Sequence, residues 1–281
     1  GLGVADQSCF QDSPDLRTKP GEVNKTSISA GKMGIDFRAD SFFASLPAMN
    51  KRFRVGILGA GLGSRLKSEA KAKPLAQLGR ETLLERMMDR FFKAGIQEIH
   101  CALRAELLSE ETRQSLPQRP ELTYLFVNTE SSLHTLGELI TSCDPAKGPV
   151  LFTMADTVML QQDFVHFINF CENLSRQENA VLLTEFVDDE KPLWAHVDSQ
   201  GNVTKFGTES AKFVTSGMYF LQPEAMRLVQ QEIASGTHKM RNFLSKLAES
   251  RSPIKSFVVK KTIDVDHPSD LEKAAQFLRG E

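Results

Sequence analysis

From residue 53 onward, short apolar runs alternate with amphipathic stretches along the chain. Each run is bounded by Gly, Pro or polar residues, which is typical of a buried strand. The runs span residues 53–58, 98–103, 122–127, 149–154 and 180–184. After the first run, apolar residues recur at helical spacing at Leu83, Leu84, Met87, Met88, Phe91 and Phe92. This alternation predicts an α/β fold with a mostly parallel sheet and helices on both faces.

The second half of the chain adds a small antiparallel element. Two short runs, 194–197 and 203–206, flank the turn sequence Asp198-Ser-Gln-Gly-Asn, which predicts a hairpin. The other expected elements are a strand over 213–221, two helices after it, and a last strand from Ile254 up to Asp264. A closing helix is expected over 271–278, and Pro268 and Asp270 are residue types that suit its first turn.

Residues 1–50 differ from the rest of the chain. They show no sustained hydrophobic periodicity and are rich in Ser, Asp, Lys and Gly. That composition favours a flexible N-terminal extension, followed by one domain over residues 51–281. Because such a segment has no apolar face to bury, we expect a chain that starts at Met49 to keep its stability and activity.

Composition narrows the class of protein. The formal net charge is −2, from 34 basic and 36 acidic residues, which gives no sign of a surface for nucleic acid or an anionic membrane. No apolar stretch approaches the ~20 residues of a membrane span. The four cysteines and six histidines are scattered, which argues for reduced thiols, a cytoplasmic location and no zinc site.

The most informative sequence is Leu58-Gly-Ala-Gly-Leu-Gly-Ser-Arg65, which directly follows the first expected strand. Glycines let a backbone approach a ligand closely, and their N–H groups can surround an anion. A dinucleotide-binding loop fits poorly, because Ser64 stands at its third glycine position and Lys73-Pro74 interrupts the helix that should follow. A P-loop is excluded because its Gly-Lys-Ser/Thr ending is absent.

Residues 58–75 resemble the L-x-A-G-x-G-x-R … K-P-L motif of the nucleotidyltransferase superfamily. The resemblance implies a Rossmann-like three-layer fold and catalytic roles for Arg65 and Lys73, because fixed positive charges stabilise charge that develops on phosphates. Gly59 departs from the superfamily's usual Ala. The alternative is a glycine-rich turn with a solvated Arg and Lys. The residues expected to bind the nucleotide here are Leu58, Ala60, Gly61, Gly63, Ser64, Arg65 and Lys73.

Three carboxylates are candidates for binding the Mg²⁺ that accompanies a nucleotide. Asp156 follows the strand expected at 149–154, and ligand sites in open α/β sheets lie beyond such strand ends. Residues 262–271 resemble the superfamily's closing D-x-D-x-P-x-D-L segment. The resemblance implies that Asp156 and Asp266 bind the ion, with Asp264 as a helper. The alternatives are a helix N-cap for Asp156 and a polar turn for the other two.

Four further residues are candidates for contacting the nucleotide base or the acceptor. Ser132 and Thr135 lie where the superfamily contacts the base, although such residues equally suit the capping of a helix. Gly217 and Lys191 lie in the half of the chain where the superfamily places its acceptor pocket. The respective alternatives are a strand glycine at a bulge and a solvated loop.

The resemblance implies a Mg²⁺-dependent nucleotidyltransferase. Such an enzyme transfers NMP from an NTP to a sugar-1-phosphate or a similar small phosphorylated acceptor and releases pyrophosphate, without a side-chain nucleophile. Two alternatives stay open. A nucleotide-sugar-dependent glycosyltransferase would use Asp264-Val-Asp266 as a metal motif but leaves Arg65 and Lys73 without a role. A non-catalytic nucleotide-binding module would release no pyrophosphate.

Overall fold

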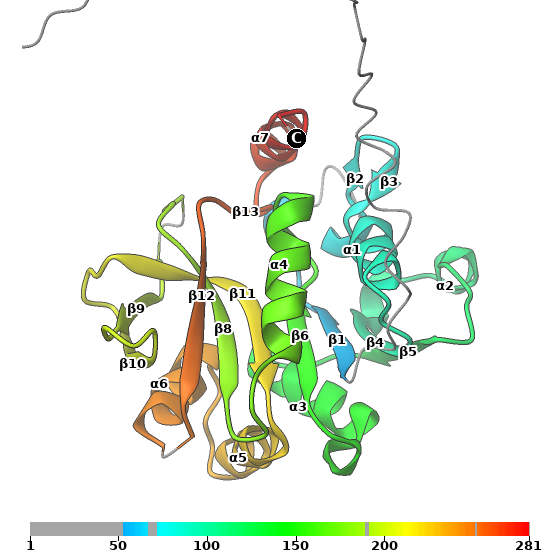
Figure 1. Cartoon of the computed structure of the whole chain (residues 1–281). Helices are drawn as coiled ribbons and strands as arrows, with labels where there is room; N and C mark the ends of the chain where they lie inside the picture. The colour runs from blue at the N-terminus through cyan, green and yellow to red at the C-terminus, as the bar shows by residue number, and fades with distance from the viewer. Residues whose placement is uncertain (1–52, 67–71, 189–190, 251, 281) are drawn as a thin grey trace, which may run out of the picture. The chain divides into compact units, whose positions relative to one another are not determined.

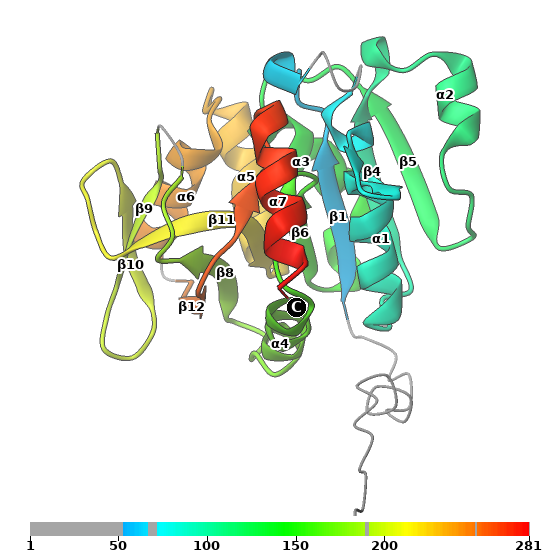
Figure 2. The same ribbon diagram turned by 90° about the horizontal axis from the view of Figure 1, so that it is seen from above.

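The structure is a computed structural model that describes residues 53–66, 72–188, 191–250 and 252–280. These residues all lie in one compact unit, in which helices cover both faces of a sheet (Figure 1, Figure 2). No helix among them is long and apolar enough to cross a bilayer. The extension expected at residues 1–50 lies outside the described residues.

The strands of the described residues are β1 (Arg54–Gly59), β2 (Gln77–Leu78), β3 (Glu81–Thr82), β4 (Ile99–Arg104), β5 (Leu122–Val127), β6 (Val150–Met154), β7 (Thr157–Val158), β8 (Asn179–Thr184), β9 (Trp194–Val197), β10 (Val203–Gly207), β11 (Phe213–Leu221), β12 (Ile254–Val259) and β13 (Ile263–Asp264). Four neighbouring strands of the main sheet, in the order β5-β4-β1-β6, are parallel. β11 runs antiparallel to β6, β8 and β9, and β12 pairs in parallel with β8. The main sheet is therefore mostly parallel on one side and mixed on the other.

The helices of the described residues are α1 (Leu83–Lys93), α2 (Glu110–Ser115), α3 (Ser132–Cys143), α4 (Gln161–Glu172), α5 (Pro223–Ala234), α6 (Met240–Glu249) and α7 (Pro268–Leu278). Successive strand residues point to opposite faces of the sheet. In β1, Val55 and Ile57 join the apolar cluster under α1 and α4, whereas Leu58 joins the cluster under α3, α5 and α6. Both faces of the sheet are buried, which explains why its strands are continuous apolar runs.

A third, smaller cluster ties α7 to the region that follows β1. Ala274 of α7 packs in this cluster with Leu66, Leu78 and Val158. Nearby, β13 pairs antiparallel with β7, and Asp264 lies opposite Thr157. Because β7 follows β6 closely in the chain, this pairing brings the acidic C-terminal segment to the carboxyl end of β6. Figure 1 shows α7 beyond that end of the sheet.

The predicted fold class is confirmed, and so are the hairpin, as β9–β10, and the strand over 213–221, as β11. The expectation of one continuous last strand is wrong, because β12 ends at Val259 and the chain leaves the sheet before β13 begins at Ile263. The elements β2, β3, β7 and α2 were not expected. They have two to six residues each, which is too short to show a hydrophobic period.

Candidate active site

Two adjoining pockets open beyond the carboxyl ends of β1 and β6. The first has a volume of about 450 Å³ and is named the charged pocket, because Arg, Lys and Asp side chains line it. The second has a volume of about 270 Å³ and is named the hydroxyl pocket, because Ser and Thr side chains line it. Both are lined in part by Leu58, Gly61 and Met154. The charged pocket is further defined by Gly63, Arg65, Lys73, Asp156, Asp264 and Asp266. The hydroxyl pocket is further defined by Arg104, Thr129, Glu130, Ser131, Ser132 and Thr135.

Two glycines of the loop after β1 allow close packing against the segment that begins at Lys73. Gly63 has a φ of +54°, and a Cβ at this residue would lie 2.8 Å from the Cβ of Lys73. A Cβ on Gly59 would lie 2.9 Å from Cγ of Pro74. Real Cβ atoms do not approach other atoms so closely, so a side chain at either residue would require the loop or the facing segment to shift.

Gly61 has a different role from its two neighbours. A Cβ on this residue would meet no other atom within 4 Å, and Gly61 lines both pockets. Its backbone is therefore open to a ligand rather than packed against protein. Ala60 next to it is buried and lines the hydroxyl pocket, and Ser64 begins the 3-10 turn η2 (Ser64–Leu66).

Lys73 is a fixed positive charge inside the charged pocket. It begins the 3-10 turn η3 (Lys73–Leu75), in which Pro74 is buried. Its ammonium contacts the carboxylate of Asp156 and lies 2.5 Å from Oδ1 of Asp266, and its side chain is only 14% exposed. Burial alone would lower the pKa of Lys73, but the two carboxylates outweigh burial and raise that pKa above its usual value. Lys73 thus stays charged and joins two acidic segments.

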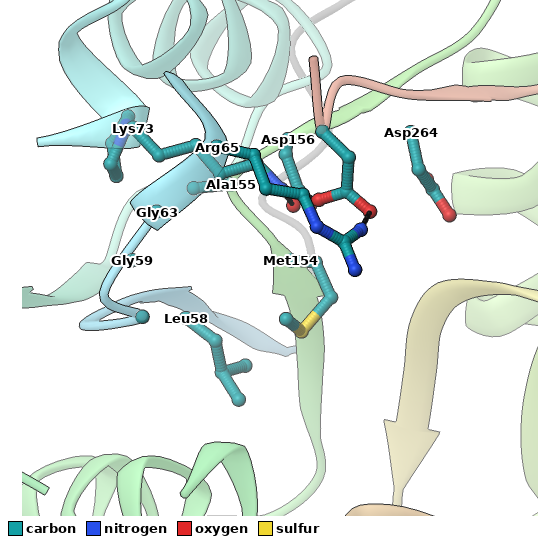
Figure 3. A pocket seen from close by; sticks show the side chains of 12 residues that line it. Leu58, Gly59, Gly63, Arg65, Lys73, Met154, Ala155, Asp156 and Asp264 are labelled. Atoms are coloured by element: carbon teal, nitrogen blue, oxygen red, sulfur yellow. Dashed lines mark hydrogen bonds and ion pairs between the residues drawn. The ribbon is translucent and has the colours of Figure 1, made fainter. Parts of the chain in front are cut away.

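Asp266 lies between two cations. Its Oδ1 contacts Lys73, and its Oδ2 lies 3.6 Å from Nη1 of Arg65. Figure 3 shows Arg65, Lys73, Asp156 and Asp264 among the residues that line the charged pocket. The side chains of Arg65 and Asp266 are 52% and 47% exposed, and ion pairs of such exposure contribute little to stability. The guanidinium of Arg65 thus lies at the charged pocket with a partially exposed carboxylate beside it.

Asp264 differs from Asp266 because it forms no ion pair among the described residues. Thr157 Oγ1 donates a hydrogen bond of 3.1 Å to its Oδ1. The residue is exposed at the pocket, and its carboxylate lies close to that of Asp156. Partial loss of hydration and the negative charge of Asp156 raise the pKa of Asp264 above its usual value. Asp156 and Asp264 are therefore repelling carboxylates, and a bound cation would relieve the repulsion.

Asp156 lies in the short connection between β6 and β7. Its carbonyl oxygen accepts a hydrogen bond of 3.1 Å from the N–H of Val265, which fixes it beside the β13 segment. The N-cap interpretation of Asp156 is wrong, because α4 begins at Gln161 and its N-cap is Leu160. The side chain of Asp156 is instead directed to Lys73 in the charged pocket.

The C-terminal acidic segment combines the end of a strand with the start of a helix. Asp264 ends β13, and Asp270 accepts hydrogen bonds from the N–H groups of Asp266 and His267 at 3.2 and 2.8 Å. Asp270 thereby caps α7, as expected from its place in the first turn. Asp264 and Asp266 both line the charged pocket.

The hydroxyl pocket is built mainly from groups that bond to one another. Thr135 Oγ1 lies 2.6 Å from Thr129 Oγ1 and donates to the carbonyl of Ser131 at 3.2 Å. Ser131 Oγ accepts from the N–H of His134 and caps α3. Helix capping therefore falls on Ser131, whereas Ser132 lies at the first residue of α3 and lines the pocket.

Arg104 is a pocket residue that the sequence analysis missed. It ends β4, its side chain is 14% exposed, and its Nη1 donates to the carbonyls of Thr129 at 2.9 Å and Ala60 at 3.3 Å. It thus connects the glycine loop to the loop before α3. The signal was present in the sequence, because a charged residue at the end of a buried strand is also what marked Asp156.

Residues 55–234 match the family of MobA-like NTP transferase domains. The chain belongs to this family. Nucleotidyl transfer from an NTP is therefore the general activity of the domain, and the resemblance of the glycine loop to the nucleotidyltransferase superfamily is confirmed. No curated protein matches the sequence.

Several solved structures share the fold of this NTP transferase domain at low sequence identity. HddC from Yersinia pseudotuberculosis is 21% identical, with a TM-score of 0.60 over 80% of this chain and 98% of that chain. A putative glucose-1-phosphate thymidylyltransferase from Bacillus anthracis is 14% identical, with a TM-score of 0.65 over 82% and 96%. The inositol-1-phosphate CTP transferase from T. maritima is 13% identical, with the same TM-score and coverage. At these identities the likeness shows the fold.

Gly217 and Lys191, the residues predicted to contact the acceptor, are not among the residues that define either pocket. Gly217 has a φ of +68° at a register shift in β11, and a Cβ there would lie 2.7 Å from Thr157 Oγ1. Packing and backbone conformation thus account for this glycine at a bulge. Lys191 is exposed, and its carbonyl accepts a hydrogen bond from Arg241. Contact of either residue with an acceptor stays a prediction.

Proposed function

We propose that this NTP transferase domain transfers NMP from an NTP to a small phosphorylated acceptor, such as a sugar-1-phosphate, in the cytoplasm. The observation that carries the proposal is the charged pocket, where Lys73 and Arg65 lie with three carboxylates beside an open glycine loop. An oxygen of the acceptor phosphate attacks the α-phosphorus of the NTP. The bond from that phosphorus to the β-phosphate oxygen breaks, and pyrophosphate leaves with the electron pair.

The positive groups of the charged pocket fit the triphosphate of the NTP. The loop N–H groups near Gly61 and the exposed guanidinium of Arg65 bind the β- and γ-phosphates. The fixed ammonium of Lys73 stabilises the negative charge that develops around the α-phosphate. Holding donors in place before the reaction lowers the barrier, because they need not reorganise as the charge moves.

The carboxylates of the charged pocket fit a divalent cation. Carboxylate oxygens are the ligands that Mg²⁺ prefers, and the ammonium of Lys73 between Asp156 and Asp266 marks this place as attractive to cations. Mg²⁺ bound there would supply positive charge that stabilises the transferred phosphoryl group. The sequence hypothesis paired Asp156 with Asp266. The charges favour Asp264 as the partner of Asp156, because Asp266 already contacts Lys73 and Arg65.

The hydroxyl pocket is the proposed place for the nucleotide base, because it adjoins the charged pocket at Gly61 and Leu58. Its Ser132 hydroxyl is the proposed base contact, whereas the Thr135 hydroxyl already bonds to Thr129. For the acceptor, the structural neighbours include a putative glucose-1-phosphate thymidylyltransferase and an inositol-1-phosphate CTP transferase. Their names support sugar-1-phosphates and phospho-alcohols as the acceptors to test.

The proposed activity is tested by pyrophosphate release. The full chain is mixed with Mg²⁺, each of the four NTPs, and in turn a set of sugar-1-phosphates and small phospho-alcohols, and Asp156→Asn serves as the inactive control. We expect release with one NTP and one acceptor class, and an NDP-linked product in equal amount. Binding of NTPs without release from any pair would instead support a non-catalytic module. Consumption of an NDP-sugar with transfer of its sugar would support a glycosyltransferase.

A further inference from the structure

Three side chains that can bind a metal ion meet at the rim of the hydroxyl pocket. Glu130 lies in the loop before α3, His134 lies in the first turn of α3, and His238 lies in the connection between α5 and α6. One ligand atom from each residue can be chosen so that all three lie within 4.8 Å of one another. The fold thus brings together residues from two distant parts of the sequence. The spacing of the histidines along the chain does not show that they meet.

The hydrogen bonds of the cluster leave ligand atoms available. Nδ1 of His134 lies 2.9 Å from Ser131 Oγ, which fixes the orientation of the ring and leaves its Nε2 without a hydrogen-bond partner in the described part of the chain. Nδ1 of His238 lies 3.6 Å from a carboxylate oxygen of Glu130. A partner on one nitrogen that orients a histidine ring is the arrangement that metal-binding histidines usually have. The two rings lie with their centroids 5.4 Å apart.

The chemistry of these ligands selects the kind of metal. Two imidazoles and one carboxylate suit Zn²⁺, which binds such groups at about 2.0–2.2 Å in a tetrahedral arrangement. Ligand atoms around zinc are then about 3.3 Å apart, so donors that lie within 4.8 Å of one another must approach by up to roughly 1.5 Å. Glu130 and His238 can make this movement because their side chains are 78% and 64% exposed. Mg²⁺ prefers an all-oxygen shell and does not fit two imidazoles.

We propose that Glu130, His134 and His238 bind one Zn²⁺ ion, with water as the fourth ligand. The ion joins the loop before α3 to the connection between α5 and α6. Because Glu130 also lines the hydroxyl pocket, the ion fixes one wall of that pocket. The site is separate from the carboxylates of the charged pocket, and it stands whether or not the proposed nucleotidyl transfer is correct.

The probe for this site is Zn²⁺ itself. The full, untagged chain is stripped with a chelator and titrated with Zn²⁺ by calorimetry in excess Mg²⁺, which occupies the carboxylates of the charged pocket. Cys101, Cys143 and Cys171 are buried, and a Cys9→Ser background removes the cysteine outside the described residues as a competing ligand. We expect one Zn²⁺ per chain and a higher Tm with zinc than without it.

Three ligand variants and one matched control locate the bound ion. Glu130→Gln, His134→Asn and His238→Ala should each weaken Zn²⁺ binding by at least about tenfold and remove the gain in Tm. His166→Asn, an exposed histidine on α4, should bind zinc as the parent chain does. Equal Tm values without metal establish that the variants are folded.

Two outcomes overturn the zinc site. One is the absence of saturable Zn²⁺ binding in the parent chain, which would leave Glu130 and His238 as a surface ion pair. The other is binding that is equally strong in all three ligand variants, which would place the zinc elsewhere on the molecule. Neither readout depends on turnover, so the result is independent of the nucleotidyl transfer test.

Discussion

The charged pocket and the hydroxyl pocket adjoin each other, yet the polar side chains of the two pockets differ in how far along the sequence their bonding partners lie. In the charged pocket, Lys73 contacts Asp156 and Asp266, which lie far from it in the sequence. In the hydroxyl pocket, Thr135 bonds to Thr129 and to the carbonyl of Ser131, which are close neighbours in the chain. One pocket depends on the tertiary fold, whereas the other is largely local.

This difference helps to distinguish residues that are placed to bind a ligand from residues that stabilise the fold. Local bonds of hydroxyl groups form at the start of many helices and need no ligand to explain them. Three neighbouring carboxylates are different, because the repulsion between like charges, as between Asp156 and Asp264, opposes folding. A stable fold alone does not require such an arrangement, so the charged pocket indicates function more strongly. The predictions below test this contrast.

The largest effect is expected for Asp156, which belongs both to the Lys73 contact and to the repelling pair with Asp264. Asp156→Asn should reduce the rate of pyrophosphate release by about 10³-fold, the upper end of the loss for one group that stabilises the transition state. The measurement is turnover as a function of Mg²⁺ concentration. Activity near that of the parent chain would remove the charged pocket from the mechanism.

The next effect distinguishes Asp264 from Asp266. Asp264→Asn should lower turnover by about 10²-fold or more, because it removes the proposed partner of Asp156 in cation binding. It should also raise the Tm by about 2 °C, since the variant relieves repulsion between carboxylates. Asp266→Asn should have a smaller effect on turnover, because Lys73 keeps its contact with Asp156. The reverse order of the two variants would restore the pair expected from the sequence.

Lys73→Ala should lower turnover by about 10²-fold, the loss expected for one fixed donor in the transition state. It should also lower the Tm, because Asp156 and Asp266 lose the positive charge between them. The matched control is Lys205→Ala, which removes a surface ion pair with Glu209 whose members are both more than half exposed. That variant should leave Tm and turnover unchanged, and an equal loss in both variants would mean that Lys73 has no special role.

The sequence predicted which residues line the charged pocket better than it predicted which of them contact one another. The motif from Leu58 to Leu75 and the strand before Asp156 identified the residues, because glycine conformations and strand ends depend on local sequence. Which carboxylate contacts Lys73 depends on the pairing of β13 with β7, and two-residue strands have no readable period. The choice between Asp264 and Asp266 therefore needed the tertiary structure.

The same reasoning explains the fold outside the charged pocket. The buried strand β4 and the edge strand β5 both consist mainly of apolar residues and were predicted within one residue. The break between β12 and β13 was not, because the run from Ile254 continues in apolar and polar residues without a Gly or Pro to mark its end. The meeting of Glu130, His134 and His238 was also beyond the sequence, since it depends on how α3 and the α5–α6 connection pack.

A moderate effect is expected for Arg104, which joins the glycine loop to the loop before α3 through its bonds to Ala60 and Thr129. Arg104→Met keeps the length of the side chain and removes these bonds. The KM for the NTP should rise about tenfold with a much smaller change in kcat, because a positioning group of this kind affects binding more than chemistry. Steady-state kinetics separate the two constants. A fall in kcat alone would place Arg104 in the chemical step.

The smallest effect is expected for Ser132, because the structure of α3 does not need its hydroxyl. The capping hydroxyl is that of Ser131, so Ser132→Ala should leave the Tm unchanged, whereas Ser131→Ala should destabilise the domain by about 1 kcal/mol. If Ser132 contacts the base, its loss removes one hydrogen bond and raises the KM for the NTP by about threefold to tenfold. Measured against all four NTPs, that rise should be largest for the preferred base. A uniform KM with an unchanged Tm would remove Ser132 from base recognition and would leave the hydroxyl groups of this pocket with a structural role only, in contrast to the charged pocket.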